Sequence, residues 1–489
     1  MIQQRIQRDI RHVIEQLIAD GIWHVSELVQ LPEIHVFFPQ EEDDVIEEAD
    51  YLSTIALDLE IVLRLPAIQI AQEIQARLHQ PYRQIQIVHP GVLLFSVSDE
   101  QLQFELEKCL ERGDKYGRVN TGRRRKVFIV SVQHDVVAPL DLRTARGMYI
   151  SDSLARIAQH LGYRVHQYGL LNDWGADVTR FGESVTRRWL QHQGANVTFD
   201  NDMDKGSFIT AIAQRLQMRD YKLNNLKKIE WVKERITDKA LKLLFSDIQD
   251  ITEHSMHIHI HEWIRDKKAI TEGRSLFDEL QEHNVRRVII AGTVPSSWHS
   301  LDDLIVDSFS LPVVAVTEKG IPKKLSSYVS EGIAIEECIE IIGEYPARYV
   351  LQLFPSSEVL IELEYSLFLQ KNKQHPYWYI RDALKDMKSF TKERLRSKTE
   401  VHFPTTELHE CARVLTQYPA VLVMSLEKMD TSLLALYVMD IVQQWNSIQK
   451  GIGQDEVYDD AAVVIARAAQ SIIHNAGNLL GVDFLSTNR

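Results

Sequence analysis

Residues 139–147 read Pro-Leu-Asp-Leu-Arg-Thr-Ala-Arg-Gly, and they have the frame of a nucleotide-binding loop. The apolar, β-branched run Val127-Phe128-Ile129-Val130-Ser131-Val132 precedes them and predicts a strand. A helix is predicted around residues 151–157, which read Ser-Asp-Ser-Leu-Ala-Arg-Ile. Because the first backbone N–H groups of a helix lack partners inside it, a strand, a turn and a helix N-terminus together make a place for phosphate.

The frame Pro-Leu-x-x-x-x-Ala-Arg-Gly, followed by Asp-Ser-Leu-Ala-Arg, resembles the first catalytic signature of arginyl-tRNA synthetases, which are class I enzymes. In that family the four central positions read His-Val-Gly-His, and the resemblance implies that the histidines donate to ATP phosphates and that the glycine makes room for adenine. Here these positions are Asp141, Leu142, Arg143 and Thr144. Asp141 brings a carboxylate where an anion must sit, and like charges at ~4 Å repel by roughly 4 kcal/mol at an effective dielectric near 20.

Arg143 brings a long side chain to the position of the family's glycine. Alternatively, Arg143 folds back onto phosphate as a replacement cation, a role that suits arginine. The signature positions Asp141, Arg143 and Thr144 are therefore degenerate catalytic candidates.

A second segment, residues 170–177, is similar to the family's Tyr-x-Asn-Asp-x-Gly-x-Gln stretch, which lines the amino-acid pocket there. Asn172, Asp173 and Gly175 match, whereas Leu170 replaces the tyrosine and Asp177 replaces the glutamine. Asn-Asp-x-Gly is also an ordinary turn sequence. A structural turn and a remnant of a substrate pocket can be the same residues.

A third segment, Lys323-Lys324-Leu325-Ser326-Ser327, resembles the family's mobile Lys-Met-Ser-Lys-type loop, which stabilises the triphosphate. Lys324 is its candidate catalytic cation, Ser327 replaces the second lysine, and an ordinary exposed loop is the alternative.

Between Asn284 and Val285 we find no counterpart of the family's Tyr-x-x-x-Asp pattern, which recognises the guanidinium of the substrate. Because a desolvated guanidinium without a carboxylate is costly, we do not expect selective arginine binding.

The 489 residues suffice for three or four domains, and the net charge of −14 describes an acidic protein without general affinity for polyanions. No apolar run approaches the ~18 residues that span a bilayer, and the first residues lack the apolar core of a signal peptide. We therefore expect a cytoplasmic protein without a membrane partner. Three scattered cysteines are most simply packing residues.

The resemblance covers nearly the whole chain and implies an α/β fold of four domains. These are an N-terminal tRNA-contacting α/β domain (1–118), a degenerate class I domain with a Rossmann-like parallel sheet (119–345), a connecting helical segment (346–400) and a DALR-type anticodon-binding helical bundle (401–489). Helical spacing of apolar residues predicts helices at 2–18, 407–412, 434–445 and 461–476, and alternation predicts a strand at 34–38.

Four consecutive cations, Arg123, Arg124, Arg125 and Lys126, follow a linker at 113–118. They could hold the backbone phosphates of an RNA. The alternative is a solvated lead-in to the first catalytic strand. No aromatic residue is interleaved with them, so the run gives no sign of base stacking.

Three histidines, His257, His259 and His261, alternate with isoleucines, so on a strand their imidazoles would share one face. Such a pair or triplet can bind zinc or another borderline metal. The alternative is a solvent-facing row opposite a buried face of Ile258 and Ile260.

The leading hypothesis is a relative of arginyl-tRNA synthetases that has lost or nearly lost arginylation, needs no cofactor, and binds tRNA or a protein partner. An arginine tRNA or a related RNA is the expected ligand, and DNA is not. The first rival is a working ligase that uses ATP and Mg²⁺ and activates arginine or another carboxylate through Arg143, Arg146, Lys323 and Lys324. The second is a metal-dependent activity at the histidines.

Overall fold

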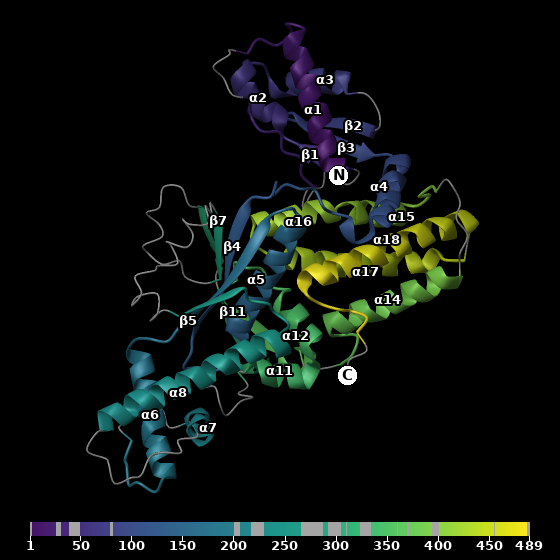
Figure 1. The fold of residues 1–489 in the computed structure, drawn as a ribbon. Helices are drawn as coiled ribbons and strands as arrows, with labels where there is room; N and C mark the ends of the chain where they lie inside the picture. Colours follow the sequence, from purple (N-terminus) through teal and green to yellow (C-terminus); the bar gives the residue numbers. More distant parts are fainter. Residues whose placement is uncertain are drawn as a thin grey trace. The chain divides into compact units, whose positions relative to one another are not determined.

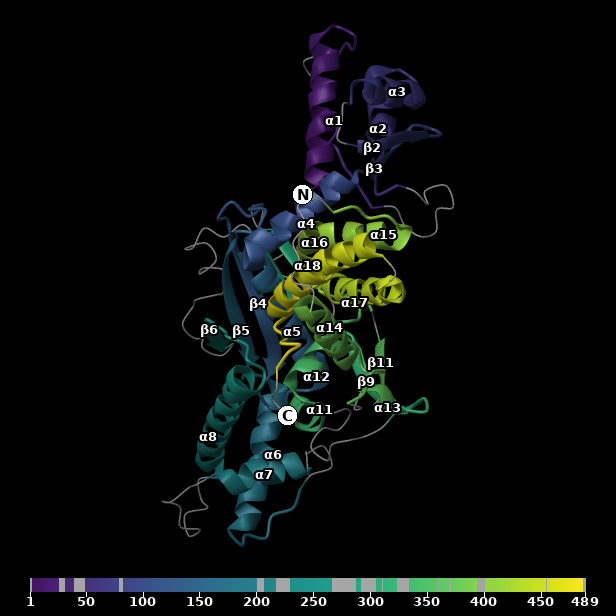
Figure 2. The same cartoon turned by 90° about the vertical axis from the view of Figure 1, so that its right-hand side faces the viewer.

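The computed structural model describes residues 2–25, 31–38, 49–78, 82–199, 206–216, 229–265, 287–291, 305–309, 311–322, 334–358, 360–368, 371–393, 401–453 and 455–486. These form two compact units, the first from residues 1–117, 383–421 and 440–473, the second from residues 118–382, 422–439 and 474–489. Figure 1 and Figure 2 show the ribbon in two views. The loop with Lys323 and Lys324 and the junction at Asn284 lie outside the described residues, and the division into four domains stays a prediction.

The first unit opens with helix α1, Ile2–Ala19, whose buried residues Ile2, Ile6, Ile10, Val13, Ile14 and Leu17 confirm the predicted amphipathic helix. An antiparallel sheet of order β1-β3-β2 follows, built from β1 (Tyr51–Ser53), β2 (Tyr82–Val88) and β3 (Val92–Val97). Helices α2 (Ile55–Leu63), α3 (Ala67–Arg77) and α4 (Asp99–Arg112) and a 3-10 turn, Gly113–Lys115, complete this part.

The strand predicted at 34–38 is wrong. Ile34 and Val36 are buried, as the alternation requires, but only Phe37 pairs with a neighbour, as an isolated bridge to Leu52. The alternation of apolar residues therefore predicted which side chains are buried, but the backbone does not pair with a neighbouring strand along this segment.

The C-terminal helices are α14 (Pro376–Glu393), α15 (Thr406–Thr416), α16 (Tyr418–Glu427), α17 (Ser432–Ile448) and α18 (Glu456–Leu480), with a 3-10 turn at Gln449–Gly451. They confirm the three helices predicted there. Within the first unit, Trp445 of α17 packs on Phe390 of α14, with ring centroids 5.5 Å apart. Arg413 of α15 lies 3.6 Å from Asp50, which precedes β1, so bundle residues and the N-terminal sheet share one unit.

The second unit is built on a parallel sheet of order β6-β5-β4-β7-β8. Its strands are β4 (Lys126–Asp135), β5 (Arg164–Asn172), β6 (Glu262–Arg265), β7 (Arg287–Ala291) and β8 (Ile305–Phe309). The chain runs from β4 outward to β6 and then returns to the other side of β4 at β7. This reversal of strand order is the switch point beside which open α/β sheets bind ligands, at the carboxyl ends of the strands. The predicted Rossmann-like fold is confirmed.

Helix α5 (Leu142–His160) follows β4, and α6 (Ala176–His192) follows β5. Helices α7 (Ser207–Arg215) and α8 (Ile229–Asp250) lie beside α6 in both views (Figures 1 and 2). A π-helical turn, Ile251–Ser255, continues α8.

A small three-stranded sheet, β10-β9-β11, is made from β9 (Val313–Glu318), β10 (Ile321–Pro322) and β11 (Leu360–Glu364). Helices α11 (Ile335–Ile342), α12 (Glu344–Leu351) and α13 (Tyr365–Phe368) adjoin it in sequence. Among the described helices, none is both long and apolar enough to cross a bilayer.

Candidate functional site at the first strand of the parallel sheet

The helix after β4 begins at Leu142, earlier than the helix predicted around Ser151, because Asp141 caps it. Asp141 has extended backbone angles (φ −84°, ψ 171°), and its Oδ1 accepts a hydrogen bond of 2.8 Å from the backbone N–H of Thr144. Leu140 and Leu142, both 2% exposed, anchor the turn on either side. The chain thus places its own carboxylate at the helix N-terminus, where the partial positive charge favours an anion.

The two arginines of the signature point in different directions. Arg143 is exposed, and its Nε donates to the carbonyl oxygen of Leu311 at 2.9 Å. Arg146 is fully buried, with Nε donating to the carbonyl of Leu351 at 3.0 Å and Nη2 to those of Phe354 at 2.8 Å and Pro355 at 3.1 Å. Although burial lowers the pKa of Arg146 to about 10, the group stays charged at neutral pH. Nε and Nη2 of Arg146 therefore satisfy carbonyls at and just after the end of α12, and Arg146 is not among the residues that line the cavity described next.

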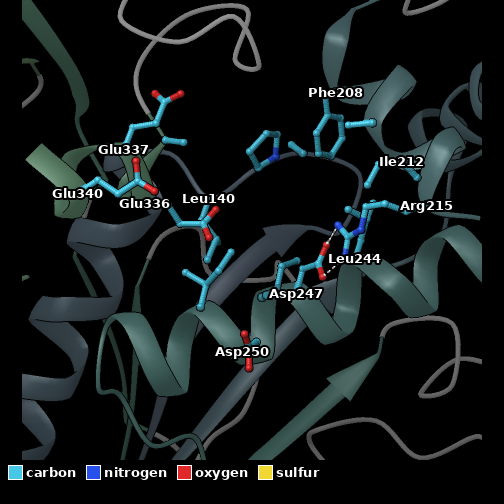
Figure 3. A pocket seen from close by; sticks show the side chains of 16 residues that line it. Leu140, Phe208, Ile212, Arg215, Leu244, Asp247, Asp250, Glu336, Glu337 and Glu340 are labelled. Atoms are coloured by element: carbon cyan, nitrogen blue, oxygen red, sulfur yellow. Dashed lines mark hydrogen bonds and ion pairs between the residues drawn. The ribbon is translucent and has the colours of Figure 1, made fainter.

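A cavity of about 570 Å³ lies beside the signature turn (Figure 3). Its walls come from the loop Ala138–Leu140 and from helices α7, α8 and α11. The start of α11 is fixed against the loop, because the N–H of Ile335 donates to the carbonyl of Leu140 at 2.9 Å and Ala334 forms a β-bridge with Asp141.

Acidic and apolar side chains line the cavity together. Its lining includes five carboxylates, which belong to Asp247, Asp250, Glu336, Glu337 and Glu340. Among the described lining residues Arg215 is the one cation, and it is paired with Asp247 through contacts of 2.6 and 2.7 Å. Burial, followed by the charges of Asp247 and Glu340, raises the pKa of Glu336. The described lining residues thus carry more negative than positive charge.

The four candidates for the amino-acid pocket lie together in the turn from β5 to α6. Asn172 Oδ1 accepts from the N–H of Trp174 at 3.2 Å, and buried Asp173 is ion-paired with Arg265 of β6 at 2.7 Å. Gly175 precedes α6 with a φ of +110°, which favours glycine. Asp177, 70% exposed, pairs with Arg180 at 3.2 Å. None of the four lines the described cavity.

The basic run lies at the amino end of β4, at the opposite end of that strand from the signature turn. Arg123, Arg124, Arg125 and Lys126 are all exposed. The structure thus separates these candidate RNA contacts from the cavity.

The strand predicted for the three histidines is wrong, because residues 257–260 carry no regular structure, His257 has a φ of +50° and β6 begins at Glu262. His257 Nε2 lies 3.4 Å from Glu344, away from the pair of His259 and His261, whose ring centroids are 5.1 Å apart. In the part of the chain that the structure describes, no group of three histidine, cysteine or acidic residues could hold a metal ion.

His166 of β5 is the imidazole that sequence reasoning missed. Its ring centroid lies 4.6 Å from that of His261, and the Nδ1 of His261 accepts from the backbone N–H of Gln167 at 3.2 Å. Only the pairing of β5 with the segment before β6 brings the two rings together, and no local pattern in the sequence signals it.

The strand order and the signature turn after β4 define the nucleotide-binding fold of class I synthetases. The structure aligns with the arginyl-tRNA synthetase of Thermus thermophilus over 99% of both chains (TM-score 0.67, 13% identity). It aligns with that of Plasmodium falciparum over 98% of both chains (TM-score 0.67, 13% identity). No family model matches the chain.

Curated relatives are named arginine–tRNA ligase. That of Desulforamulus reducens is 22% identical over 98% of both chains, and that of Desulfosudis oleivorans is 21% identical over 93% of this chain and 94% of the relative. The alignment with the ligase of Prosthecochloris aestuarii, at 26% identity, spans 46% of this chain and 41% of that enzyme. Along almost its full length the chain is therefore similar in sequence to proteins named arginine–tRNA ligase and similar in fold to solved arginyl-tRNA synthetases.

Proposed function

We propose that this protein has lost or nearly lost arginine activation and binds tRNA, alone or together with a protein partner. The observation that carries the proposal is the Asp141 carboxylate, bonded at 2.8 Å to the N–H of Thr144 at the start of α5. Phosphate recognition at a helix N-terminus depends on such N–H groups. In this chain one of these N–H groups, that of Thr144, is already bonded to the carboxylate of Asp141.

The neighbouring cavity supports the same conclusion. A nucleotide at the signature turn would meet the negative charges of Asp141 and of the five carboxylates in the cavity wall. Losing groups that stabilise charge in a transition state lowers rates by orders of magnitude. ATP and Mg²⁺ are therefore not expected as resident ligands, and the contribution of Lys324 stays a prediction.

The tRNA ligand is proposed from the relatives, since ligases named for arginine and tRNA align along almost the full chain. A scaffold of that length includes the N-terminal sheet and the C-terminal helices as well as the parallel sheet. An arginine tRNA is the first RNA to test.

A working ligase is the alternative, and one observation favours it: Arg143 is exposed at the signature turn and donates to Leu311 only through Nε. Its terminal nitrogens could reach a phosphate. This alternative predicts adenylate formation with arginine or another acid, and its loss in Arg143→Ala.

Pyrophosphate exchange into ATP, with arginine, Mg²⁺ and unfractionated tRNA present, tests the loss of activity. We expect no exchange above the blank. We also expect that ATP and Mg²⁺ do not raise the melting temperature, because a ligand raises it only by binding the native protein. Exchange in the presence of arginine would refute the proposed loss. A gel shift with tRNA at low salt, weakening as salt rises, is expected for the RNA role, and no shift at low salt would end that role.

A further inference from the structure

We propose that Arg123 and Arg124, together with Arg164, form a binding surface for the phosphodiester backbone of RNA at the amino end of the parallel sheet. This surface is called the basic turn below. The inference rests on the proposed tRNA binding and adds to it where the RNA is held. It places the contact at the far end of β4 from the signature turn, so that binding needs no nucleotide site.

The basic turn has a fixed backbone. The N–H of Arg124 donates to the carbonyl of Gly162, and the N–H of Arg164 donates to that of Arg125, both at 2.9 Å. Gly122 packs so closely on the neighbouring turn that a Cβ there would lie 2.5 Å from the backbone nitrogen of Tyr163. The segment before β4 is thus locked onto the segment before β5, which fixes the backbone positions from which the arginine side chains extend.

The backbone conformation of the basic turn disfavours the residues that occupy it. Arg123 and Arg124 have φ angles of +44° and +60°. A left-handed conformation costs a residue with a Cβ about 1–2 kcal/mol, and glycine or asparagine adopts it more easily. A turn selected for stability alone would carry those residues. Two consecutive arginines at this cost indicate that their charges serve another purpose.

The side chains divide into one that builds the turn and three that are free. Arg125 is structural, because its Nη2 donates to the carbonyl of Thr121 at 3.0 Å and to the hydroxyl of Tyr163 at 3.1 Å, and its guanidinium lies 5.3 Å from the centre of that ring. Arg123, Arg124 and Arg164 are exposed and form no ion pair with any residue that the structure describes.

The chemistry of this surface fits phosphates rather than bases. Arg164 lies in register with Lys126, the first residue of β4, so it stands directly beside the strand that the two arginines precede. The ring of Tyr163 has the guanidinium of Arg125 over it, so a base could not stack on that face. Exposed cations on a chain of net charge −14 attract a polyanion locally and without sequence preference.

The test is the double variant Arg123→Asn/Arg124→Asn, in which asparagine removes both charges and suits the left-handed conformation. We expect an unchanged or higher melting temperature. We also expect the affinity for tRNA to be about tenfold lower near 100 mM salt. The slope of log affinity against log salt concentration should become shallower by about one unit for each phosphate contact that is lost. The matched control is Lys319→Asn, since Lys319 is an exposed cation with a φ of +55° in the turn between β9 and β10. Its tRNA affinity should stay that of the parent protein.

Two results would overturn the inference. If the double variant binds tRNA like the parent, the basic turn is not the RNA surface, while the proposed tRNA binding still stands. If the double variant has both a lower melting temperature and a lower affinity for tRNA, the two arginines stabilise the turn. A parent protein that fails to shift tRNA at low salt would instead refute the proposed function itself.

Discussion

The guanidinium of Arg348 is ion-paired with the carboxylate of Asp152 in the interior of the second unit, where their side chains are 0% and 6% exposed. The pair joins α12 to α5, the helix that carries the signature. Arg348 also donates through Nε to the carbonyl of Leu480 at 2.7 Å and through Nη1 to that of Met256 at 3.3 Å. One buried cation therefore connects the signature helix with the end of α18 and with the histidine segment.

Replacing this cation with an apolar residue of similar length should be strongly destabilising. In Arg348→Met, the carbonyl of Met256 loses this donor, the carbonyl of Leu480 keeps only the Nε2 of Gln352, and Asp152 keeps only Arg156, so we expect a loss of about 3–5 kcal/mol in the free energy of unfolding. Urea titration measures it. The control is Arg156→Met, because Arg156 contacts the same carboxylate at 2.8 Å but is 38% exposed, and its loss should cost about 1 kcal/mol. Equal losses in the two variants would contradict the role of burial.

One aromatic side chain of the C-terminal segment packs in the interior of the second unit. Phe484 is buried, with its ring centroid 5.1 Å from that of Tyr349 and 5.6 Å from that of Tyr377. Phe484→Ala should lower the free energy of unfolding by about 3–5 kcal/mol, because it leaves a cavity between two aromatic rings. Its neighbour Leu485 is 42% exposed, so Leu485→Ala should change stability by about 0.5 kcal/mol or less. Chemical denaturation of both variants tests the contrast.

The sequence predicted those elements whose pattern is local. In α1, six of the seven apolar residues at helical spacing are buried and the seventh, Ile18, is half-buried, and the apolar run at 127–132 lies inside β4. Such periodicities report which side of an element is buried. At His257–His261 the pattern was right about burial, since Ile258 and Ile260 are 1% and 8% exposed, and wrong about the strand, because pairing needs a partner that the segment itself does not specify.

Contacts between distant residues could not be predicted. Arg348 and Asp152 are 196 positions apart, and a single sequence gives no reason to pair one arginine with one aspartate. The signature turn was partly predictable, because an aspartate such as Asp141 is a favoured residue for capping the start of a helix. Arg146 looked like a possible ligand group in the sequence, and only the structure shows its guanidinium bonded to the end of α12.

A buried histidine should make the protein acid-sensitive. His375 is 0% exposed, its Nδ1 accepts from the N–H of Tyr377 at 3.2 Å, and burial lowers the pKa of His375 to about 4. The unfolded chain, with an ordinary histidine pKa of 6.5, binds the proton more readily. Stability is therefore full above pH 6.5 and falls as the pH drops toward 4, by on the order of 3 kcal/mol in total.

The free energy of unfolding, measured between pH 7 and pH 4, tests this acid sensitivity. In His375→Asn most of the decrease toward pH 4 should disappear. The control is His12→Gln, because His12 is exposed on α1 and should leave the slope as in the parent. A variant at position 375 with the parental pH dependence would show that other groups cause the acid sensitivity.

Removing the Asp141 carboxylate should free a site for anions. Asp141→Ala loses the bond to the N–H of Thr144 and should cost about 1 kcal/mol of stability, whereas Asp141→Asn keeps a capping oxygen and should cost less. If the carboxylate occupies the place of a phosphate, sulfate should raise the melting temperature of Asp141→Ala more than that of the parent. The control is Ser98→Ala, which removes the cap of α4, where Ser98 Oγ accepts from Gln101 at 3.3 Å. Its response to sulfate should equal the parent's, and an equal response in Asp141→Ala would mean that the carboxylate does not exclude anions from the signature turn.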